Sequence, residues 1–180
     1  DFGVQVLHAW GMTEMSPLGT ICSFKPEILE LNENDRISIQ ETTGHPPFSV
    51  ELKITDDNGN QLPHDGKTQG KLWSRGAAVV QKYLKTEEET VDKHGWFDTG
   101  DVATIDKNGY MRITDRSKDI IKSGGEWISS IDLENAAVGH PEIVEAAAIG
   151  IKHPKWDERP ILVVVSKQNS KISKKEIFEF

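Results

Sequence analysis

The sequence has few of the features that mark a secreted, membrane-spanning or nucleic-acid-binding protein. It contains one cysteine, Cys22, which excludes an intrachain disulfide and suits a reducing compartment. No apolar run approaches the roughly 18 residues of a membrane span, and no secretory signal opens the chain. Acidic residues outnumber basic residues by 29 to 21, and the net charge of −8 would repel a phosphate backbone. We therefore expect a cytoplasmic protein with no nucleic-acid partner.

Both ends of the chain have the character of cut ends. The 180 residues, 36 % of them hydrophobic, can bury one core and a small satellite, yet there is no starting methionine. Near the other end, Ser173 and Glu176 have the spacing of a capping box, which predicts a helix start. That helix would reach Phe180 after fewer than two turns, too few to bury an apolar face. We expect an internal piece of a longer polypeptide.

The part of the chain before residue 116 is predicted to be rich in β-structure. The stretch 24–43 has no clear period and is interpreted as a loop with one helix, and Thr86 with Glu89 predicts a short capped acidic helix. Turn sequences at 57–59 and 106–109 indicate tight connections between strands. Alternating apolar residues predict strands at 4–10, 48–55, 70–76 and on both sides of the turn at 106–109.

The pattern changes after a charged stretch at 116–122. A capped helix at 129–138, two apolar strands at 144–151 and 161–165, and the helix after Ser173 form a helix, strand, strand, helix unit. This order predicts a mixed α/β fold of the α+β class: a β-rich domain tail at 1–116, then a small, truncated α+β domain at 117–180.

Three stretches carry residues that could do chemistry. The first, HAWGMTEM at 8–15, offers Glu14 and Thr13 as oxygen ligands for magnesium and phosphate, and Trp10 as a face for a purine. A turn with a buried tryptophan is the alternative. The second, GWFDTGDVATID at 95–106, places Asp98 and Asp101 immediately before a strand, where a carboxylate could accept two sugar hydroxyls. A plain hairpin turn is the alternative there.

The third stretch, TDRSKDIIKSGGEWIS at 114–129, combines charges with a glycine pair. Gly124 and Gly125 stand inside what reads as a second strand, and glycine lets a ligand or another backbone approach closely. A solvated linker would tolerate the charges, but it has no need of the glycines.

The order of these stretches resembles one enzyme family over essentially all 180 residues. WGMTE, GKLWSRG, GWFDTGD and GYMRITDRSKDIIKSGGEWIS are similar to successive motifs of the AMP-forming acyl-CoA synthetases, within the adenylate-forming superfamily. The later stretch LENAAVGHPEIVEAAAIGIKHPKWDERPILVVV is most similar to synthetases of medium-chain or longer fatty acids. The resemblance implies that ATP and a carboxylate give acyl-AMP, and that the CoA thiol then displaces AMP.

The resemblance also implies roles for single residues. Trp10 would stack on adenine, Thr13 would contact a phosphate as a catalytic residue, and Glu14 would be catalytic and hold Mg²⁺. Asp101 would accept both ribose hydroxyls, with Arg116 donating to the same sugar. The nucleotide-binding set implied by the motifs is Trp10, Gly11, Met12, Thr13, Asp101, Arg116 and Lys122.

The same resemblance explains the charged stretch and the glycine pair. Lys118 would be the hinge about which the small domain rotates between the two half-reactions. Gly124 and Gly125, with Trp127 near them, would then lie beside the channel for CoA. Gly11 would leave the acyl pocket open, which favours a medium-chain or longer acid.

The substrates implied are therefore a carboxylic acid, ATP with Mg²⁺, and CoA. The upstream phosphate loop and the downstream catalytic lysine of such enzymes are outside this sequence, so we expect the chain alone to be inactive. Two alternatives stay open: an adenylating enzyme that loads a carrier-protein thiol, and a noncatalytic module that binds acyl-adenylate. The sequence does not fix the oligomeric state, and a homodimer is one alternative.

Overall fold

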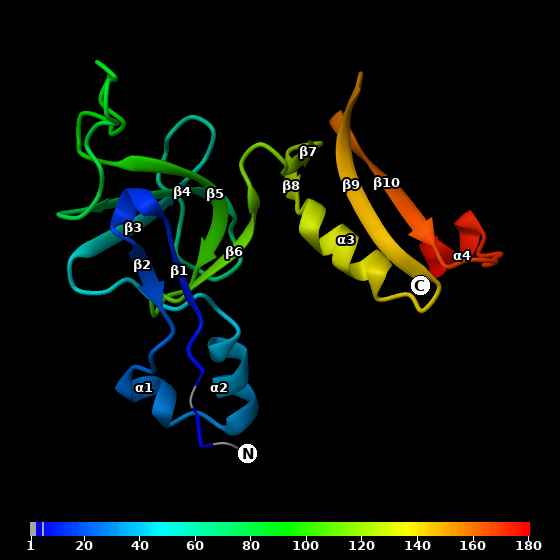
Figure 1. Cartoon of the computed structure of the whole chain (residues 1–180), viewed down its shortest axis with the longest axis horizontal. Coiled ribbons are helices and arrows are strands. Elements are labelled where there is room, and N and C mark those ends of the chain that lie inside the picture. Colours follow the sequence, from blue (N-terminus) through cyan, green and yellow to red (C-terminus); the bar gives the residue numbers. More distant parts are fainter. Residues whose placement is uncertain (1–2, 5) are drawn as a thin grey trace. The chain divides into compact units, whose positions relative to one another are not determined.

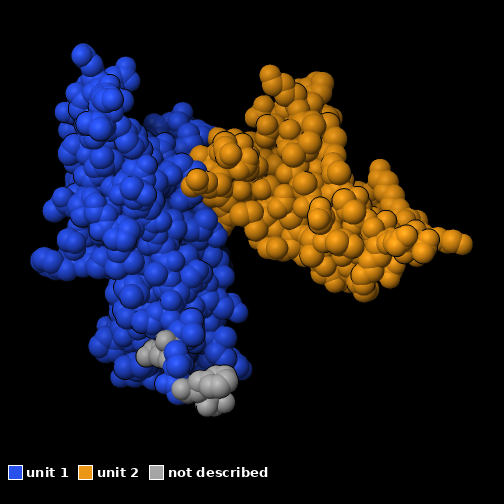
Figure 2. All heavy atoms as spheres, in the orientation of Figure 1, with its two compact units in different colours: residues 1–113 blue, residues 114–180 orange. Residues whose placement is uncertain are grey.

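Figure 1 shows the computed structural model of the chain, which describes residues 3–4 and 6–180 as a mixed α+β fold. The chain divides into two compact units, unit 1 (residues 1–113) and unit 2 (residues 114–180), coloured separately in Figure 2. This division lies close to the domain boundary expected after residue 116, and a hinge at Lys118 remains a prediction.

Unit 1 is built on a four-stranded sheet with the strand order β3-β4-β5-β6. Its last strand begins in unit 1 and ends in unit 2. The strands are β3 (Val50–Thr55), β4 (Gly70–Gly76), β5 (Phe97–Ile105) and β6 (Met111–Arg116). The turn predicted at 106–109 connects β5 to β6, because the Asp106 carboxylate accepts the amides of Asn108 and Tyr110.

The larger buried cluster of unit 1 lies on one face of this sheet. Ile54 and Leu72 are direct partners across β3 and β4, and both are fully buried. They pack with Ala103, Ile105 and Met111 from the other two strands. Alternation along the strands places these residues on one face, so the strands predicted from that alternation at 48–55 and 70–76 are confirmed.

Shorter elements surround this sheet. A two-stranded antiparallel sheet, with the turn η1 between its strands, carries the HAWGMTEM stretch, and two helices follow it. The helix α2 is capped by the Asn32 side chain, which accepts the Asp35 amide. The elements are β1 (Ala9–Gly11), η1 (Thr13–Met15), β2 (Leu18–Ile21), α1 (Pro26–Leu29) and α2 (Glu33–Gln40). One helix was expected at 24–43, and the structure has two.

Unit 2 contains a second four-stranded sheet, with the strand order β8-β7-β10-β9. The helix α3 packs along β9 (Figure 1), and the Ser129 hydroxyl caps its first turn by accepting the Asp132 amide. The elements are β7 (Ile121–Ser123), β8 (Glu126–Ile128), α3 (Ser130–Val138), β9 (Ile143–His153), β10 (Asp157–Ser166) and α4 (Lys174–Glu179). The capping box predicted for Ser173 and Glu176 is confirmed.

Three local predictions are wrong. The strand predicted at 4–10 is a strand only from Ala9 onward, because the antiparallel partner β2 begins its pairing there; Gln5 lies outside the described residues. No helix begins at Thr86, because its hydroxyl donates to the Tyr83 carbonyl and Lys85 has a positive φ of 67°.

The third wrong prediction concerns the glycine pair. Gly124 and Gly125 are not inside a strand; they form the turn that joins β7 to β8. Their φ angles are 62° and 90°, and a two-residue hairpin turn with positive φ at both positions strongly favours glycine. The glycines therefore have a conformational reason that the sequence interpretation missed.

Within the described part of the chain, none of the helices is long and apolar enough to cross a membrane.

Candidate functional site

The residues singled out from the sequence fall into two groups, one in each unit. The unit 1 group is Trp10, Gly11, Met12, Thr13, Glu14 and Asp101. The unit 2 group is Arg116, Lys118, Lys122, Gly124, Gly125 and Trp127. The structure brings members of each group together with partners that lie far away in the sequence.

Trp10 and Asp101 meet directly in unit 1. The indole Nε1 of Trp10, on β1, donates to Oδ2 of Asp101, on β5, at 3.1 Å. Asp101 is only 5 % exposed, and Trp10 is half-buried against the core of the large sheet. A Cβ atom on Gly19 would lie 2.3 Å from the Trp10 ring, so the ring covers that glycine. The contact unites two motifs that are 91 residues apart.

The backbone around Asp101 is shaped by its neighbours. The Thr99 hydroxyl donates to the Leu72 carbonyl and accepts the Asp101 amide. Gly100 has a φ of 72°, and its amide donates to Oδ1 of the exposed Asp98 at 2.9 Å. This bend within β5 separates the two carboxylates of the motif: Asp98 faces solvent, whereas Asp101 is buried beside Trp10.

Gly11 has a packing reason to be glycine. A Cβ atom at this position would lie 1.9 Å from the backbone oxygen of Pro17, on the facing segment. No side chain fits there without moving the backbone. Glycine at position 11 therefore does not by itself favour an open acyl pocket.

Glu14 acquires a partner that no local pattern indicated. The Tyr83 hydroxyl donates to Oε1 of Glu14 at 2.8 Å, and this bond raises the pKa of the Tyr83 phenol. The Val80 amide donates to the Glu14 carbonyl at 2.8 Å, while the buried Met15 anchors the turn. The carboxylate therefore stands on a fixed turn, and the exposed Thr13 stands beside it in the chain.

In unit 2, Asp115 organises the segment that carries Arg116 and Lys118. The Asp115 carboxylate is almost completely buried, and it accepts the Ser130 amide at 2.6 Å and the Ser130 hydroxyl at 2.9 Å. It therefore satisfies a free amide at the start of α3. The amides of Asp119 and Ile120 both donate to the Arg116 carbonyl, which forms a turn with Lys118 exposed at its tip.

The β7–β8 hairpin presents the other members of the unit 2 group. Nζ of Lys122 lies 4.7 Å from the centroid of the Trp127 ring, a cation–π contact. A Cβ atom on Gly124 would lie 2.8 Å from the ring of Trp156, so that ring packs against the turn.

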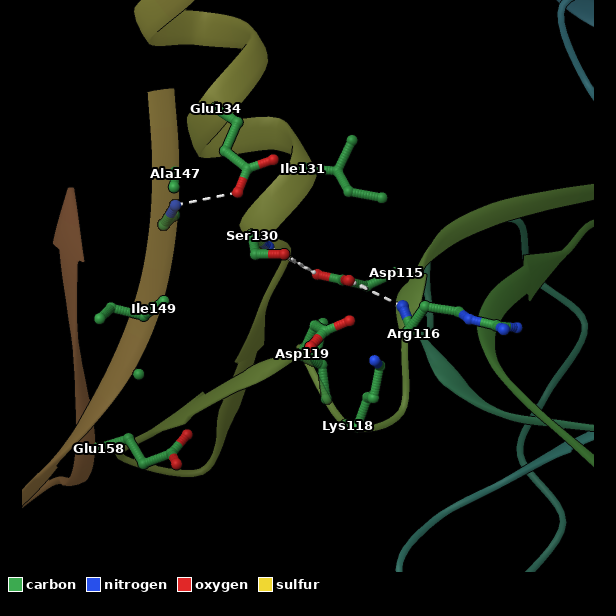
Figure 3. A pocket seen from close by; sticks show the side chains of 13 residues that line it. Asp115, Arg116, Lys118, Asp119, Ser130, Ile131, Glu134, Ala147, Ile149 and Glu158 are labelled. Atoms are coloured by element: carbon green, nitrogen blue, oxygen red, sulfur yellow. Dashed lines mark hydrogen bonds between the residues drawn. The ribbon is translucent and has the colours of Figure 1, made fainter. Parts of the chain in front are cut away.

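A charged pocket of about 490 Å³ lies within unit 2. Figure 3 shows Glu134 and Glu158 on its wall, and dashed lines mark the bond from Ser130 to Asp115 and the bond of Glu134 to a β9 amide. Glu134 Oε1 accepts the Ala148 amide at 2.9 Å. Three carboxylates of the wall, those of Asp115, Glu134 and Glu158, therefore accept backbone amides of unit 2.

Within residues 3–4 and 6–180, no group of three or more histidine, cysteine, aspartate or glutamate side chains could hold a metal ion. A magnesium ion at Glu14 would take its other ligands from nucleotide phosphates and water, which is the usual way Mg²⁺ is bound with phosphate substrates.

Three residues at these sites were missed by the sequence reasoning. Tyr83 lies 69 residues from Glu14, so spacing gave no signal. Asp115 did have a sequence signal, because it is a carboxylate near the end of a predicted strand and a capped helix follows. Glu158 gave none, because its partner is a backbone amide on another strand.

Two family models match the chain in order. The model described as AMP-binding enzyme matches residues 1–84, and the model described as AMP-binding enzyme C-terminal domain matches residues 132–180. A 3-methylmercaptopropionyl-CoA ligase of Ruegeria lacuscaerulensis is 55 % identical over 99 % of this chain and 33 % of its own length. A medium-chain-fatty-acid–CoA ligase of Ectopseudomonas oleovorans is 48 % identical over the same shares. The chain thus spans about one third of the length of these relatives.

Solved structures match the fold. ATP-bound MatB from Rhodopseudomonas palustris has a TM-score of 0.74 at 27 % identity, covering 98 % of this chain and 33 % of that one. The o-succinylbenzoate CoA synthetase MenE from Bacillus subtilis, in complex with AMP, has the same TM-score and identity and covers 96 % and 33 %. The curated relatives described above are CoA ligases. The chain itself belongs to the AMP-binding enzyme family.

Proposed function

We propose that this chain is part of an AMP-forming ligase that activates an apolar carboxylic acid with ATP and transfers the acyl group to CoA. The observation that carries the proposal is the bond from Trp10 to Asp101. It joins the WGMTE and GWFDTGD stretches, so the side chains that we propose to stack on adenine and to bind the ribose are neighbours in unit 1.

The side chains of unit 1 suit a nucleotide. Asp101 is an acceptor that could hold two ribose hydroxyls, and its buried setting strengthens such bonds because water competes less. Trp10 is half-buried, and the exposed part of its ring could stack on adenine. Thr13 offers a hydroxyl to a phosphate, and it follows Gly11, the last residue of β1, and Met12, which precedes η1.

Glu14 is proposed to hold Mg²⁺ beside the phosphates. When bound, the ion would neutralise the charge that develops on the pyrophosphate leaving group. Tyr83 orients the carboxylate through its hydroxyl, so one oxygen of Glu14 is fixed while the other can face the metal.

Unit 2 is proposed to serve both half-reactions by moving. Lys118 would be the hinge, and Arg116 would contact the nucleotide. Lys122 would contact a phosphate or CoA in one of the two states, and the turn at Gly124 and Gly125, with Trp127, would lie beside CoA. Gly124 lies against the Trp156 ring, whereas no atom lies within 4 Å of the Cβ position of Gly125, so that side of the turn is open to a ligand.

We further propose that the acid is of medium or longer chain, that the partners are small molecules, and that the protein works in the cytoplasm. The acid preference rests on the stretch 133–165 alone, because Gly11 has a packing reason of its own.

The test is AMP release by the full-length protein with ATP, Mg²⁺, CoA and straight-chain acids of graded length, together with 3-methylmercaptopropionate. The proposal expects AMP release that requires an acid and thioester formation that requires CoA. If a thioester forms with a carrier protein but not with CoA, the acyl acceptor is a carrier-protein thiol and the CoA part of the proposal is wrong. No AMP release with any acid would overturn the proposal, and the same assay on the 180-residue chain is expected to show no turnover.

A further inference from the structure

The β7–β8 hairpin contacts β10 through three consecutive residues, 156–158, at the start of that strand. Ser123 pairs with Asp157 in the sheet register. On one side of this pair, the Gly124 amide donates to the Trp156 carbonyl at 2.8 Å. On the other side, the Lys122 amide donates at 2.9 Å to Oε2 of the Glu158 side chain. A carboxylate therefore takes the place that a backbone carbonyl would have in a regular ladder.

The space for this carboxylate is created by a glycine. A Cβ atom on Gly150, in β9, would lie 2.8 Å from Oε2 of Glu158. The Glu158 side chain thus lies over the bare backbone of β9 and reaches the hairpin on the far side of β10, in agreement with the strand order β8-β7-β10-β9. Gly150 is not one of the glycines with a positive φ. The reason for glycine at this position is therefore the close contact with Glu158 and not the backbone conformation.

We propose that Glu158 is a positioning residue for the CoA-dependent half-reaction. It holds the Lys122 amide, and through it the placement of the Gly124 turn that the proposed function puts beside CoA. The inference rests on that proposed function. Because acyl-AMP formation does not need CoA, loss of the Glu158 bond should separate the two half-reactions.

Glu134 provides a matched control. Its carboxylate also accepts one strand amide, that of Ala148, at the same distance of 2.9 Å, and both glutamates are half-buried on the wall of the same pocket (Figure 3). The difference is the element that each one holds: Glu134 joins α3 to β9, whereas Glu158 holds the hairpin. Removal of either carboxylate should lower the stability of unit 2. Only removal of the Glu158 carboxylate should selectively slow thioester formation.

The experiment compares Glu158→Ala and Glu134→Ala in the full-length protein. Pyrophosphate release without CoA measures acyl-AMP formation, and thioester formation from pre-formed acyl-AMP measures the second step. We expect Glu158→Ala to raise the KM for CoA or slow the second step by about tenfold or more, as misplacement of a positioned group does. Acyl-AMP formation should stay within about twofold, a small change in barrier terms, and Glu134→Ala should not separate the steps.

Two further variants keep the test decisive if Glu158→Ala folds poorly. Glu158→Gln retains an acceptor for the Lys122 amide and should restore most of the second step. Gly150→Val keeps a residue suited to a strand while its methyl groups occupy the space of the carboxylate, so it should slow the second step in the same selective way. A wild-type protein that ligates, with all these variants changing both steps equally, would overturn the inference and leave the proposed function intact. A wild-type protein that forms no acyl-AMP would instead overturn the proposed function itself.

Discussion

The two units differ in how they hold their side chains in place. In unit 1, Ile54, Leu72 and Met111 are fully buried on one face of the sheet. In unit 2, β10 is apolar at 161–165, yet its Val163 and Val165 are 55 % and 53 % exposed. Within the described residues, close packing therefore covers one face of the unit 1 sheet, whereas part of β10 in unit 2 is left uncovered and single polar bonds hold individual amides.

This difference matters for the proposed sites. The unit 1 residues Trp10 and Asp101 are part of, or adjacent to, the packed core, so the core itself keeps them in register. In unit 2, Asp115 and Glu158 hold backbone amides one at a time. A core change in unit 1 should thus affect the whole unit, and a single polar change in unit 2 should act locally.

The largest effect is expected from opening the core of unit 1. Leu72→Ala should lower the free energy of unfolding by about 2–5 kcal/mol, because it removes a fully buried side chain and leaves a cavity. Val163→Ala in unit 2 should cost less than about 1 kcal/mol, because more than half of that side chain is already exposed. Urea denaturation of the 180-residue chain measures both, and equal costs would contradict the comparison.

The next effect concerns the buried carboxylate of unit 1. Asp101→Ala should reduce kcat/KM for ATP by about 100-fold, because two hydrogen bonds to a charged acceptor would be lost. Asp98→Ala is the control, since that exposed carboxylate accepts only a local amide in the same motif, and it should change the value by less than about threefold. Pyrophosphate exchange in the full-length protein is the measurement. Similar losses in both variants would remove Asp101 from the nucleotide site.

A smaller effect is expected at the start of α3. The Ser129 hydroxyl accepts the Asp132 amide and donates to the Thr114 carbonyl, and Ser129 is buried. Ser129→Ala should therefore cost about 1–2 kcal/mol of unfolding free energy. Ser173→Ala removes the corresponding cap from the exposed helix α4 and should cost less. Thermal unfolding of the two variants tests the order, and a larger loss for Ser173→Ala would contradict it.

The smallest effect is a pH dependence in an exposed loop of unit 1. The amides of Thr68 and Lys67 and the Thr68 hydroxyl donate to the Asp65 carboxylate, which lowers the pKa of Asp65 to about 2. Because the folded pKa is below the ordinary value of about 3.9, this contribution to stability is complete above pH 3.9 and is lost as the pH falls toward 2.

An NMR titration of the Asp65 carboxyl group measures this pKa directly. Thr68→Val removes the hydroxyl donor and should raise the midpoint, while the two backbone amides keep it below the ordinary value. A wild-type midpoint near 3.9 would show that the loop does not hold the carboxylate in solution.

Elements whose signals are local could be predicted from the sequence. The turn at 106–109 and the helix caps at Ser129 and Ser173 depend on side chains bonding to nearby backbone, and all three are confirmed. The same kind of signal failed at Thr86, because its hydroxyl bonds backward to Tyr83 instead of forward into a helix. A Ser or Thr three positions before a Glu is therefore compatible with either outcome.

Features that depend on distant partners could not be predicted in this way. Alternation at 4–10 indicated a strand, but a strand needs a neighbour, and β2 pairs only from Ala9 onward. The contacts of Trp10 with Asp101 and of Glu14 with Tyr83 join residues 91 and 69 positions apart. The motifs therefore suggested which residues belong to the site, whereas the partners that orient them came only from the fold.

The most direct test of this account is a single-turnover experiment on the full-length protein with an acid, ATP, Mg²⁺ and CoA, in which acyl-AMP and thioester are measured in the same samples. The account predicts that Asp101→Ala forms little acyl-AMP, whereas Glu158→Ala forms acyl-AMP at the wild-type rate and accumulates it. If both variants lower acyl-AMP and thioester formation in the same proportion, the claim that Asp101 serves acyl-AMP formation and Glu158 serves thioester formation is wrong.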